Sequence, residues 1–528
     1  MRLVLVDWLI IAVYAIVIFT VGMFIVKKPK TSEGYFLANR KLRWPFIGAS
    51  LFASNISAEH FVGLAGSGFA LGMAIGTVEW SAVYCLLPLI LLFLPLYMKN
   101  NIYTVPEFLE KRFNARVRTV FSGMMLVLSI LTKISISLWA SSIVFSSVLG
   151  WDRVTVIWLV GLITAIYTMK GGLNAVVYTD AIQSTILLIA GVILTTIGMH
   201  HVGWWQGLKS RLDPSMFHMM KPATDLDLPW PGVILGFFLA GSFYWSMDQV
   251  LVQRVFAARD LNEGRKGAVF CGFLKLLTPL VLVLPGLIAK ALYSSEIKVN
   301  DDAYPVLLQH LMPNGLLGLT VAGISAALMG HLSATYNSIA TLFTRDFYLK
   351  LRPEASNTSQ IRVGRLAVLA VFVLGAVWAP VIGSFKSLFI YLQVVSIYLM
   401  MPFVGVFFLG VLWKRVNVAG VYAAVTCGFT AGLTLMFDSQ MHFLPFMKHP
   451  LLRPWLHGAV IEFVLCAAVL VVASLLTVPP SAESVRTTTI DWSAREPCRS
   501  DRVSFVHDYR PYLLILVVTV TALWYWMR

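Results

Sequence analysis

The sequence predicts an all-α membrane protein with about fourteen transmembrane helices. Hydrophobic residues make up 58% of the 528-residue chain and charged residues only 13%, about half of the charged share that is usual in a globular protein. Apolar runs of about 20 residues, the length that spans ~30 Å of hydrocarbon, recur from one end of the chain to the other. Lys and Arg gather in alternate loops between these runs, as expected for cytoplasmic loops.

The expected spans lie, in order, at about 5–27, 44–66, 69–97, 117–149, 153–170, 178–200, 229–251, 265–291, 314–343, 362–384, 386–412, 417–437, 455–477 and 510–527. The first run is too long for the apolar region of a signal peptide and lacks a small-residue cleavage site. We therefore expect a retained helix there.

The loop charges predict the orientation. Every second loop is basic, beginning with the first, which carries Lys27, Lys28, Lys30, Arg40, Lys41 and Arg43. These loops are expected in the cytoplasm, which places both termini outside a plasma membrane, or the inner membrane of a bacterium. The same loops largely explain the formal net charge of +15, so this charge does not indicate nucleic-acid binding.

The segments outside the membrane are short. The longest loops, 201–228 and 478–509, are below the size that builds an independent core. This disfavours a membrane-bound enzyme and a receptor domain, and no obligatory protein partner is evident. The five cysteines are scattered without a metal-like spacing and are interpreted as structural or incidental.

The stretch ASNISAEHF at 53–61 concentrates polar side chains inside an apolar span: Ser54, Asn55, Ser57, Glu59 and His60. Ser and Asn compete for backbone hydrogen bonds, and the glycine-rich run GLAGSGFALG follows at once. We therefore expect a broken helix here. Irregular backbone at membrane depth is tolerated only where it is buried in protein or lines a watery cavity, so the break predicts a binding site.

A second break is expected in LAGSFYWSMDQ at 239–249, where Gly241 and Ser242 lie in the middle of a span. The step from the span at 44–66 to the span at 229–251 is five segments. This offset is the one that inverted five-helix repeats require. Two unrelated glycine kinks are the alternative.

Further ionisable residues lie within spans: Glu79, Lys133, Asp180, Asp248, Lys275, His331 and Glu462. An ionisable group there needs a partner, a cavity or a function. Lys133 and Glu462, taken alone, are interpreted as interfacial groups or helix-to-helix contacts. Asp180 is either an intramembrane carboxylate that serves coupling or gating, or a helix N-cap near the cytoplasmic face.

Several segments resemble the sodium/solute symporter family, and most of all its sodium/glucose cotransporter branch. They include ASNISAEHFVGLAGSG, YTVPEFLEKRF, MKGGLNAVVYTDAIQ, FYWSMDQVLVQR, YNSIATLFTRDFY and FLGVLWKRVN, in the family's order over nearly the whole chain. The resemblance implies a fourteen-helix, LeuT-type fold with two broken helices. Its parts would be a first helix and cytoplasmic loop (1–43), a ten-helix transport core (44–412, with repeats at about 44–200 and 229–412), and three C-terminal helices (413–528).

The resemblance also implies a sugar site. The matching positions are Asn55, His60, Glu79, Lys275 and Gln393 for the sugar hydroxyls, with Tyr244 and Trp245 at the inner gate and stacking position. Glu79 and Lys275 are expected to stabilise each other as a charge pair. Ala82 and Gly241 stand where some relatives carry a polar side chain, so a contact to the sugar is expected to be missing.

The family's sodium site is altered. In relatives, carbonyls at the positions of Ala53 and Ile56 face hydroxyls on a later helix, and this chain has Ala327, Gly330 and His331 at the hydroxyl positions. Three alternatives remain open. Protonated His331 replaces the ion, because imidazole titrates near neutrality. Sodium binds instead near Asp180 with Ser333 and Thr179. Or coupling is lost.

The sequence therefore predicts a transporter, not an enzyme, that moves a glucose- or galactose-like hexose through the lipid bilayer by alternating access. Its expected partners are the sugar and a coupled monovalent cation, Na⁺ or H⁺, with no other cofactor. The alternatives are an inositol or sugar-acid transporter, an uncoupled uniporter, or a sugar sensor.

Overall fold

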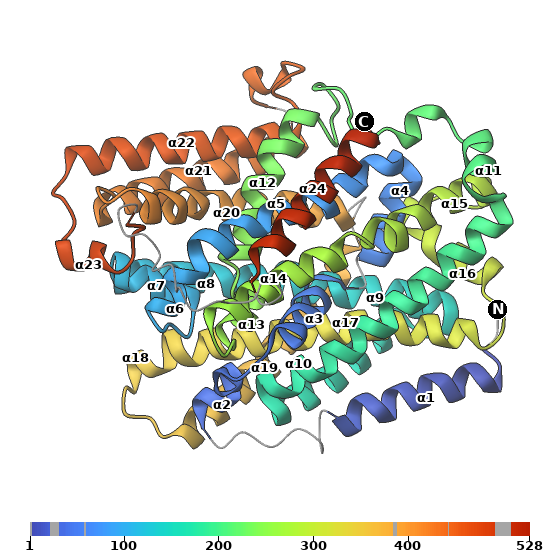
Figure 1. The fold of residues 1–528 in the computed structure, drawn as a ribbon, viewed down its shortest axis with the longest axis horizontal. Helices are drawn as coiled ribbons and strands as arrows, with labels where there is room; N and C mark the ends of the chain where they lie inside the picture. Colours follow the sequence, from blue (N-terminus) through green and yellow to red (C-terminus); the bar gives the residue numbers. More distant parts are fainter. Residues whose placement is uncertain are drawn as a thin grey trace.

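The computed structural model describes residues 3–21, 31–57, 60–383, 388–441, 443–491 and 508–527. Within these residues the regular structure is helical, apart from two isolated β-bridges that pair Leu42 with Ala258 and Lys221 with Pro229. The helices, labelled as in Figure 1, are α1 (Leu5–Thr20), α2 (Ser32–Leu37), α3 (Trp44–Asn55), α4 (Ala65–Leu71), α5 (Gly76–Pro88), α6 (Leu94–Lys99), α7 (Val105–Arg112), α8 (Ala115–Leu128), α9 (Ser135–Leu149), α10 (Arg153–Val202), α11 (Trp204–Arg211), α12 (Trp230–Ser246), α13 (Gln249–Phe256), α14 (Leu261–Lys275), α15 (Leu284–Tyr293), α16 (Ala303–Leu311), α17 (Leu316–Leu342), α18 (Leu349–Leu351), α19 (Asn357–Ile382), α20 (Leu388–Leu412), α21 (Val418–Met441), α22 (Trp455–Leu476), α23 (Ala482–Arg486) and α24 (Arg510–Trp526).

Short π-helical turns interrupt or extend several of these helices, at His60–Leu64, Leu89–Phe93, Ser129–Ile134, Pro279–Val283 and Phe343–Tyr348. Ten continuous helical stretches of the described chain are long and apolar enough to cross a membrane, and α1 and α24 are shorter apolar helices. The expected all-helical membrane architecture is therefore confirmed. The count of about fourteen spans stays a prediction.

The two expected spans at 153–170 and 178–200 are joined in α10 by one non-helical residue. Gly172 has φ 60° and ψ −160°, a conformation that is essentially restricted to glycine. A Cβ at this position would also lie 2.6 Å from the carbonyl oxygen of Tyr35. Gly172 therefore forms the turn that joins the two halves of α10, and α2 packs against this turn.

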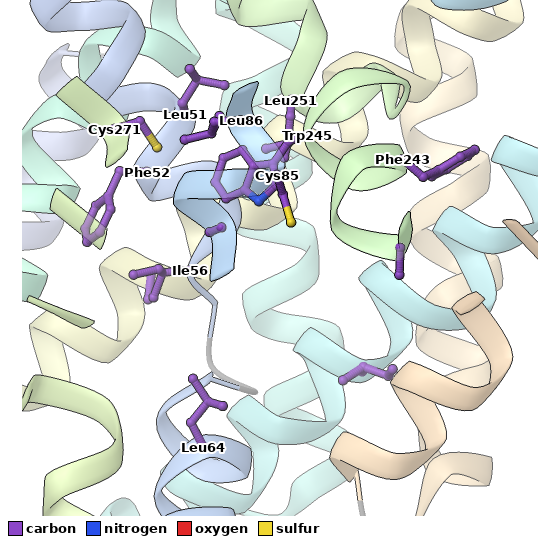
Figure 2. Close-up of a cluster of buried hydrophobic side chains, with 14 of the residues drawn as sticks. Leu51, Phe52, Ile56, Leu64, Cys85, Leu86, Phe243, Trp245, Leu251 and Cys271 are labelled. Carbon is purple, nitrogen blue, oxygen red and sulfur yellow. The ribbon is translucent and has the colours of Figure 1, made fainter. Parts of the chain in front are cut away.

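The first expected break is present. α3 ends at Asn55, Ile56 is extended with φ −92° and ψ 128°, and a π-helical turn begins at His60 and leads into α4. Figure 2 shows Ile56 and Leu64 on the two sides of this interruption. Glu59, singled out in the sequence, lies outside the described residues. The ring of His60 supports the break, because its Nδ1 lies 3.3 Å from the backbone nitrogen of Ser57.

The second break is also present within 239–249, although it lies after Gly241 and Ser242, which are both inside α12. The helix ends at Ser246, and Asp248 starts α13 by accepting a hydrogen bond from the backbone N–H of Val250 at 2.9 Å. An Asp that caps a new helix sets this boundary. Gly241 has a packing role instead, since a Cβ there would lie 2.4 Å from the Sγ of Cys85.

The two broken helices lie next to each other at the centre, where α3 packs against α13, α14, α10 and α17. The helices α20, α21 and α22 group at one end of the molecule, and α1 runs along the opposite edge, against α17 (Figure 1). Asp7 of α1 accepts hydrogen bonds at 2.7 Å from the backbone N–H groups of Gly315 and Gly318. This carboxylate caps the start of α17, the helix that carries His331.

Candidate functional site

A cavity of about 150 Å³ lies between the two broken helices. Its wall comes from α3, the π-helical turn after it, α5, the π-helical turn between α8 and α9, α12, α14, α17 and α20. All seven residues expected at the sugar site line it: Asn55, His60, Glu79, Tyr244, Trp245, Lys275 and Gln393. Segments that are far apart in the sequence thus present one set of polar side chains.

Three of these residues form a buried network. The Lys275 Nζ donates to the Oδ1 of Asn55 at 2.5 Å and pairs with the carboxylate of Glu79. Lys275 is 1% exposed, Glu79 4% and Asn55 6%. A buried charge is tolerated when a partner and further hydrogen bonds compensate its lost hydration. The expected charge pair is therefore present, and it ties together α3, α5 and α14.

The aromatic side of the cavity is attached to the same network. The Nδ2 of Asn55 donates to the hydroxyl of Tyr244 at 3.2 Å. The rings of Tyr244 and Trp245 meet edge to face, with centroids 5.6 Å apart and an interplanar angle of 85°. The Lys275 Nζ lies 5.9 Å from the centre of the Trp245 ring, within cation–π range. These contacts orient an apolar plate beside hydrogen-bonding groups.

Lys133 also lines the cavity, which the sequence interpretation missed. It belongs to the π-helical turn Ser129–Ile134, pairs with the buried Asp248 at the second break, and has its Nζ 5.8 Å from the centre of the Tyr244 ring. Of the two expected roles, the helix-to-helix contact is the one present, and the Lys133 side chain is only 6% exposed. A lysine at membrane depth was the available signal, but its partner lies 115 residues away in the sequence.

The apolar wall of the cavity includes Cys85, which the sequence interpretation treated as incidental. Figure 2 shows Cys85 and Trp245 among the buried side chains of the surrounding core. Gly241 and Ala82, the two positions expected to lack a sugar contact, line the same wall. The Sγ of Cys85 therefore lies in the space that a side chain at position 241 would need.

The residues at the altered sodium-site positions lie beside the end of α3. The Nδ1 of His331 is 2.6 Å from the carbonyl oxygen of Ser54, next to the carbonyls of Ala53 and Ile56. Ala327, Gly330 and His331 are buried on α17. The imidazole thus contacts the backbone of the broken helix directly.

Asp180 is fully buried within α10, eight residues after Gly172, so the expectation of a helix N-cap is wrong. Its Oδ2 accepts hydrogen bonds from the hydroxyl of Ser50 at 2.5 Å and from the hydroxyl of Ser54 at 3.5 Å. Ser333 donates its hydroxyl to the carbonyl of Gly330 at 3.0 Å. Thr179 turns its hydroxyl to its own helix, 2.9 Å from the carbonyl oxygen of Ala175.

Glu462 lies outside the cavity, on α22. It is fully buried, and neither carboxylate oxygen has a hydrogen-bond partner among the described residues, so the expected helix-to-helix hydrogen bond is absent there. The described residues also contain no group of three or more His, Cys, Asp or Glu side chains that could hold a metal ion.

Comparison with known proteins gives a consistent result. The model of the sodium:solute symporter family matches residues 35–428. The sodium/myo-inositol cotransporter of Mus musculus is 36% identical over 544 residues, covering 93% of this chain and 76% of the relative. Sodium/glucose cotransporter 1 of Oryctolagus cuniculus is 35% identical over 540 residues, covering 93% and 81%.

Among solved structures, the substrate-bound, outward-open form of a Na⁺-coupled sialic acid symporter aligns with a TM-score of 0.78 at 21% identity, over 90% of this chain and 99% of that one. A nucleobase-cation-symport-1 family transporter with bromovinylhydantoin bound aligns with a TM-score of 0.52 at 14% identity, over 86% and 97%. At these identities the likeness shows the fold alone, and that fold is the one expected from the sequence.

Proposed function

The chain belongs to the sodium:solute symporter family, and from this premise we propose that it carries a neutral hexose, such as glucose or galactose, together with Na⁺. It is a transport protein rather than an enzyme. Inositol is the second candidate, because the myo-inositol and glucose cotransporters are almost equally similar to this chain. Both substrates are rings of hydroxyl groups.

The observation that carries the proposal is the network of Lys275, Asn55 and Glu79 at the cavity wall. An amide, an ammonium and a carboxylate together donate and accept hydrogen bonds, as the hydroxyls of a sugar require. His60 and Gln393 add two further polar groups, and Tyr244 with Trp245 supplies an aromatic surface for the apolar face of a ring.

The cavity charges favour a neutral substrate over a sugar acid. Both lysines of the cavity wall are paired, Lys275 with Glu79 and Lys133 with Asp248. A substrate carboxylate would find no unpaired ammonium group among the described residues of the wall. It would have to break an existing buried pair, which is unfavourable.

For the cation, we propose Na⁺ at the carbonyls of Ala53 and Ile56 with Asp180 and Ser333. Na⁺ is a hard cation that prefers oxygen ligands. His331 already bonds the carbonyl of Ser54, so the ion would lie on the Asp180 side of α17. Protons as the coupling ion have no support from the similar proteins, which are sodium cotransporters, and they serve as the contrasting arm of the test.

For the whole chain, we propose about fourteen spans with a ten-helix core at 44–412, repeats at about 44–200 and 229–412, and additional segments at 1–43 and 413–528. The two central breaks and the LeuT-like neighbours support this division. Transport by alternating access would then move the core around a substrate held at the breaks.

The test is uptake of labelled glucose, galactose, myo-inositol and sialic acid into proteoliposomes with an imposed Na⁺ gradient or an imposed proton gradient. We expect saturable accumulation of a neutral ring substrate under the Na⁺ gradient only. Glu79→Gln should lower it at least tenfold, while Glu462→Gln, a buried carboxylate outside the cavity, should leave it unchanged. Binding without accumulation would indicate a sensor and overturn the proposal, as would accumulation driven by protons alone.

A further inference from the structure

Glu462 is a buried carboxyl group on α22, in the part of the molecule where α20, α21 and α22 lie together (Figure 1). Its side chain is 0% exposed, and neither oxygen has a hydrogen-bond partner among the described residues. None of the salt bridges within the described chain includes it. An isolated ionised carboxylate in apolar surroundings is so unfavourable that the group binds a proton instead.

A carbonyl group of α20 borders the same space. Pro402 lies inside α20 and has no N–H to donate to the carbonyl of Tyr398, four residues earlier. A Cβ built on Gly432 of α21 would lie 2.5 Å from this carbonyl oxygen and 2.6 Å from the Oε1 of Glu462. Both oxygens therefore face the space that Gly432 leaves open. In a membrane, a neighbouring helix commonly supplies the hydrogen bond that a proline removes.

Glycines of α21 let the three helices approach each other closely at this place. A Cβ on Gly428 would lie 2.6 Å from the Cγ of Pro402 and 2.6 Å from the Sγ of Cys466. Gly428 and Gly432 are four residues apart and so lie on one face of α21. Small residues at this spacing allow the backbones of membrane helices to come near each other. Glu462 can therefore reach the bend of α20 past the face of α21.

Two acceptor oxygens that meet in a buried space repel each other unless a donor lies between them. The hydroxyl of Tyr398 is already used, because it donates to the carbonyl of Trp455 at 3.2 Å. A protonated carboxyl group needs only an acceptor, and the carbonyl of Tyr398 is one. The other ionisable side chains in electrostatic contact with this group are neutral or anionic and cannot neutralise Glu462: Cys427, Asp438 and Cys466.

We propose that Glu462 is a positioning residue of the transport site: its carboxyl group carries a proton and donates its O–H to the carbonyl of Tyr398, which fixes the bend of α20 at Pro402. The same helix presents Gln393 and Ser396 to the cavity. The inference rests on the proposed function, because it gives a residue outside the cavity a part in how firmly that cavity holds its substrate.

Infrared spectroscopy of the purified full-length protein tests the proton. A neutral carboxyl group has a C=O stretching band that is distinct from the bands of a carboxylate. We expect the parent protein to show such a band at neutral pH and Glu462→Gln to lose it. Glu79→Gln is the matched control, because Glu79 is paired with Lys275 and should not contribute to the band. A neutral-acid band that is unchanged in Glu462→Gln overturns the proposal.

Uptake kinetics test the positioning role, with whichever of labelled glucose, galactose and myo-inositol the parent protein accumulates under a Na⁺ gradient. Glu462→Leu has a similar volume and no donor, and it should raise the half-saturating concentration of that substrate at least fivefold. Glu462→Gln should keep the parent value, because its amide N–H can donate to the same carbonyl. Leu470→Ala, a buried truncation on the same helix, should lower the unfolding temperature but leave the half-saturating concentration unchanged.

Pro402→Ala keeps the test decisive if Glu462→Leu folds poorly. It returns to α20 the N–H that the carbonyl of Tyr398 lacks, so the effect of Glu462→Leu should shrink to less than twofold in the Pro402→Ala background. The four proteins form a double-mutant cycle. A fivefold effect of Glu462→Leu in both backgrounds would contradict the bond to Tyr398.

The outcome is separable from that of the transport test. A neutral-acid band that disappears in Glu462→Gln, together with no accumulation of any substrate by the parent protein, would leave the proton at Glu462 standing and overturn the symport. Accumulation with the parent half-saturating concentration in Glu462→Leu would leave the symport standing and overturn the positioning role.

Discussion

At the scale of single residues, the identity of a side chain decides what it can bind, and its neighbours decide whether it does. Asn55 shows this most directly. Its amide both accepts from Lys275 and donates to Tyr244, so one residue at a helix end joins the charged and aromatic parts of the cavity. Replacement by a residue with only one of these capacities would separate the two parts.

The pair Gly241 and Cys85 gives a residue-scale prediction about the shape of the cavity. A methyl group at Gly241 would lie 2.4 Å from the Sγ and 3.0 Å from the Cβ of Cys85. We expect Gly241→Ala to destabilise the fold by about 1–3 kcal/mol through overpacking and to reduce uptake. Thermal unfolding and initial rates of sugar uptake measure the two effects.

The double variant Gly241→Ala with Cys85→Ala is the control, because it removes the sulfur that the new methyl group meets. This double variant should recover the stability and uptake of the parent protein. Its preference among sugars should change, because positions 241 and 85 both line the cavity. If the single Gly241→Ala variant is as stable as the parent protein, then the close approach of position 241 to Cys85 does not restrict the shape of the cavity.

At the scale of elements, the two breaks use different devices. The first leaves an extended residue, Ile56, and uses the ring of His60 to satisfy the backbone of Ser57. The second uses Asp248 as the N-cap of α13 and holds that carboxylate with Lys133 from a π-helical turn. Side-chain groups thus replace the backbone hydrogen bonds that each interruption removes.

The second break yields an element-scale prediction. Lys133→Met leaves the buried carboxylate of Asp248 without its cation, and removing one member of a buried pair destabilises a protein by about 3–5 kcal/mol. We expect a lower unfolding temperature and a lower yield of folded protein. Lys170→Met, at an exposed lysine on α10, is the matched control and should match the parent protein.

Combining Lys133→Met with Asp248→Asn should restore much of the stability, because the uncompensated charge is gone while an N-cap acceptor remains. Differential scanning fluorimetry of the four proteins forms a double-mutant cycle. Strictly additive losses in that cycle would contradict the idea that the pair holds the break.

At the scale of the whole molecule, the loop charges predict a topology with both termini outside. A peptide tag placed before α1, and one placed after α24, should be reached by a membrane-impermeant antibody in intact cells. A tag inserted at 352–356, in an expected cytoplasmic loop, should become accessible only after permeabilisation. Protection of either terminal tag in intact cells would contradict the expected orientation.

The sequence by itself determined the solvent, the class of fold and the chemistry of the main cavity residues. The apolar composition and the length of each apolar run can be read from the residue types, without knowledge of how the helices pack. The unusual polarity of ASNISAEHF located the first break, because few backbone conformations accommodate such side chains at membrane depth. Asn55, Glu79 and Lys275 were found by resemblance, and the structure brings them into contact.

The tertiary structure decided the contacts between distant segments. Lys133 meets Asp248, Gly241 meets Cys85, and Gly330 faces Gln183 and Asp180 only because the π-helical turn Ser129–Ile134, α5, α10, α12, α13 and α17 fold around one centre. A sequence pattern reports the period of a helix but not which face of another helix it meets. The grouping of Gln183 and Asp180 around Gly330 therefore depended on packing, since it is defined by neighbours that lie far apart along the chain.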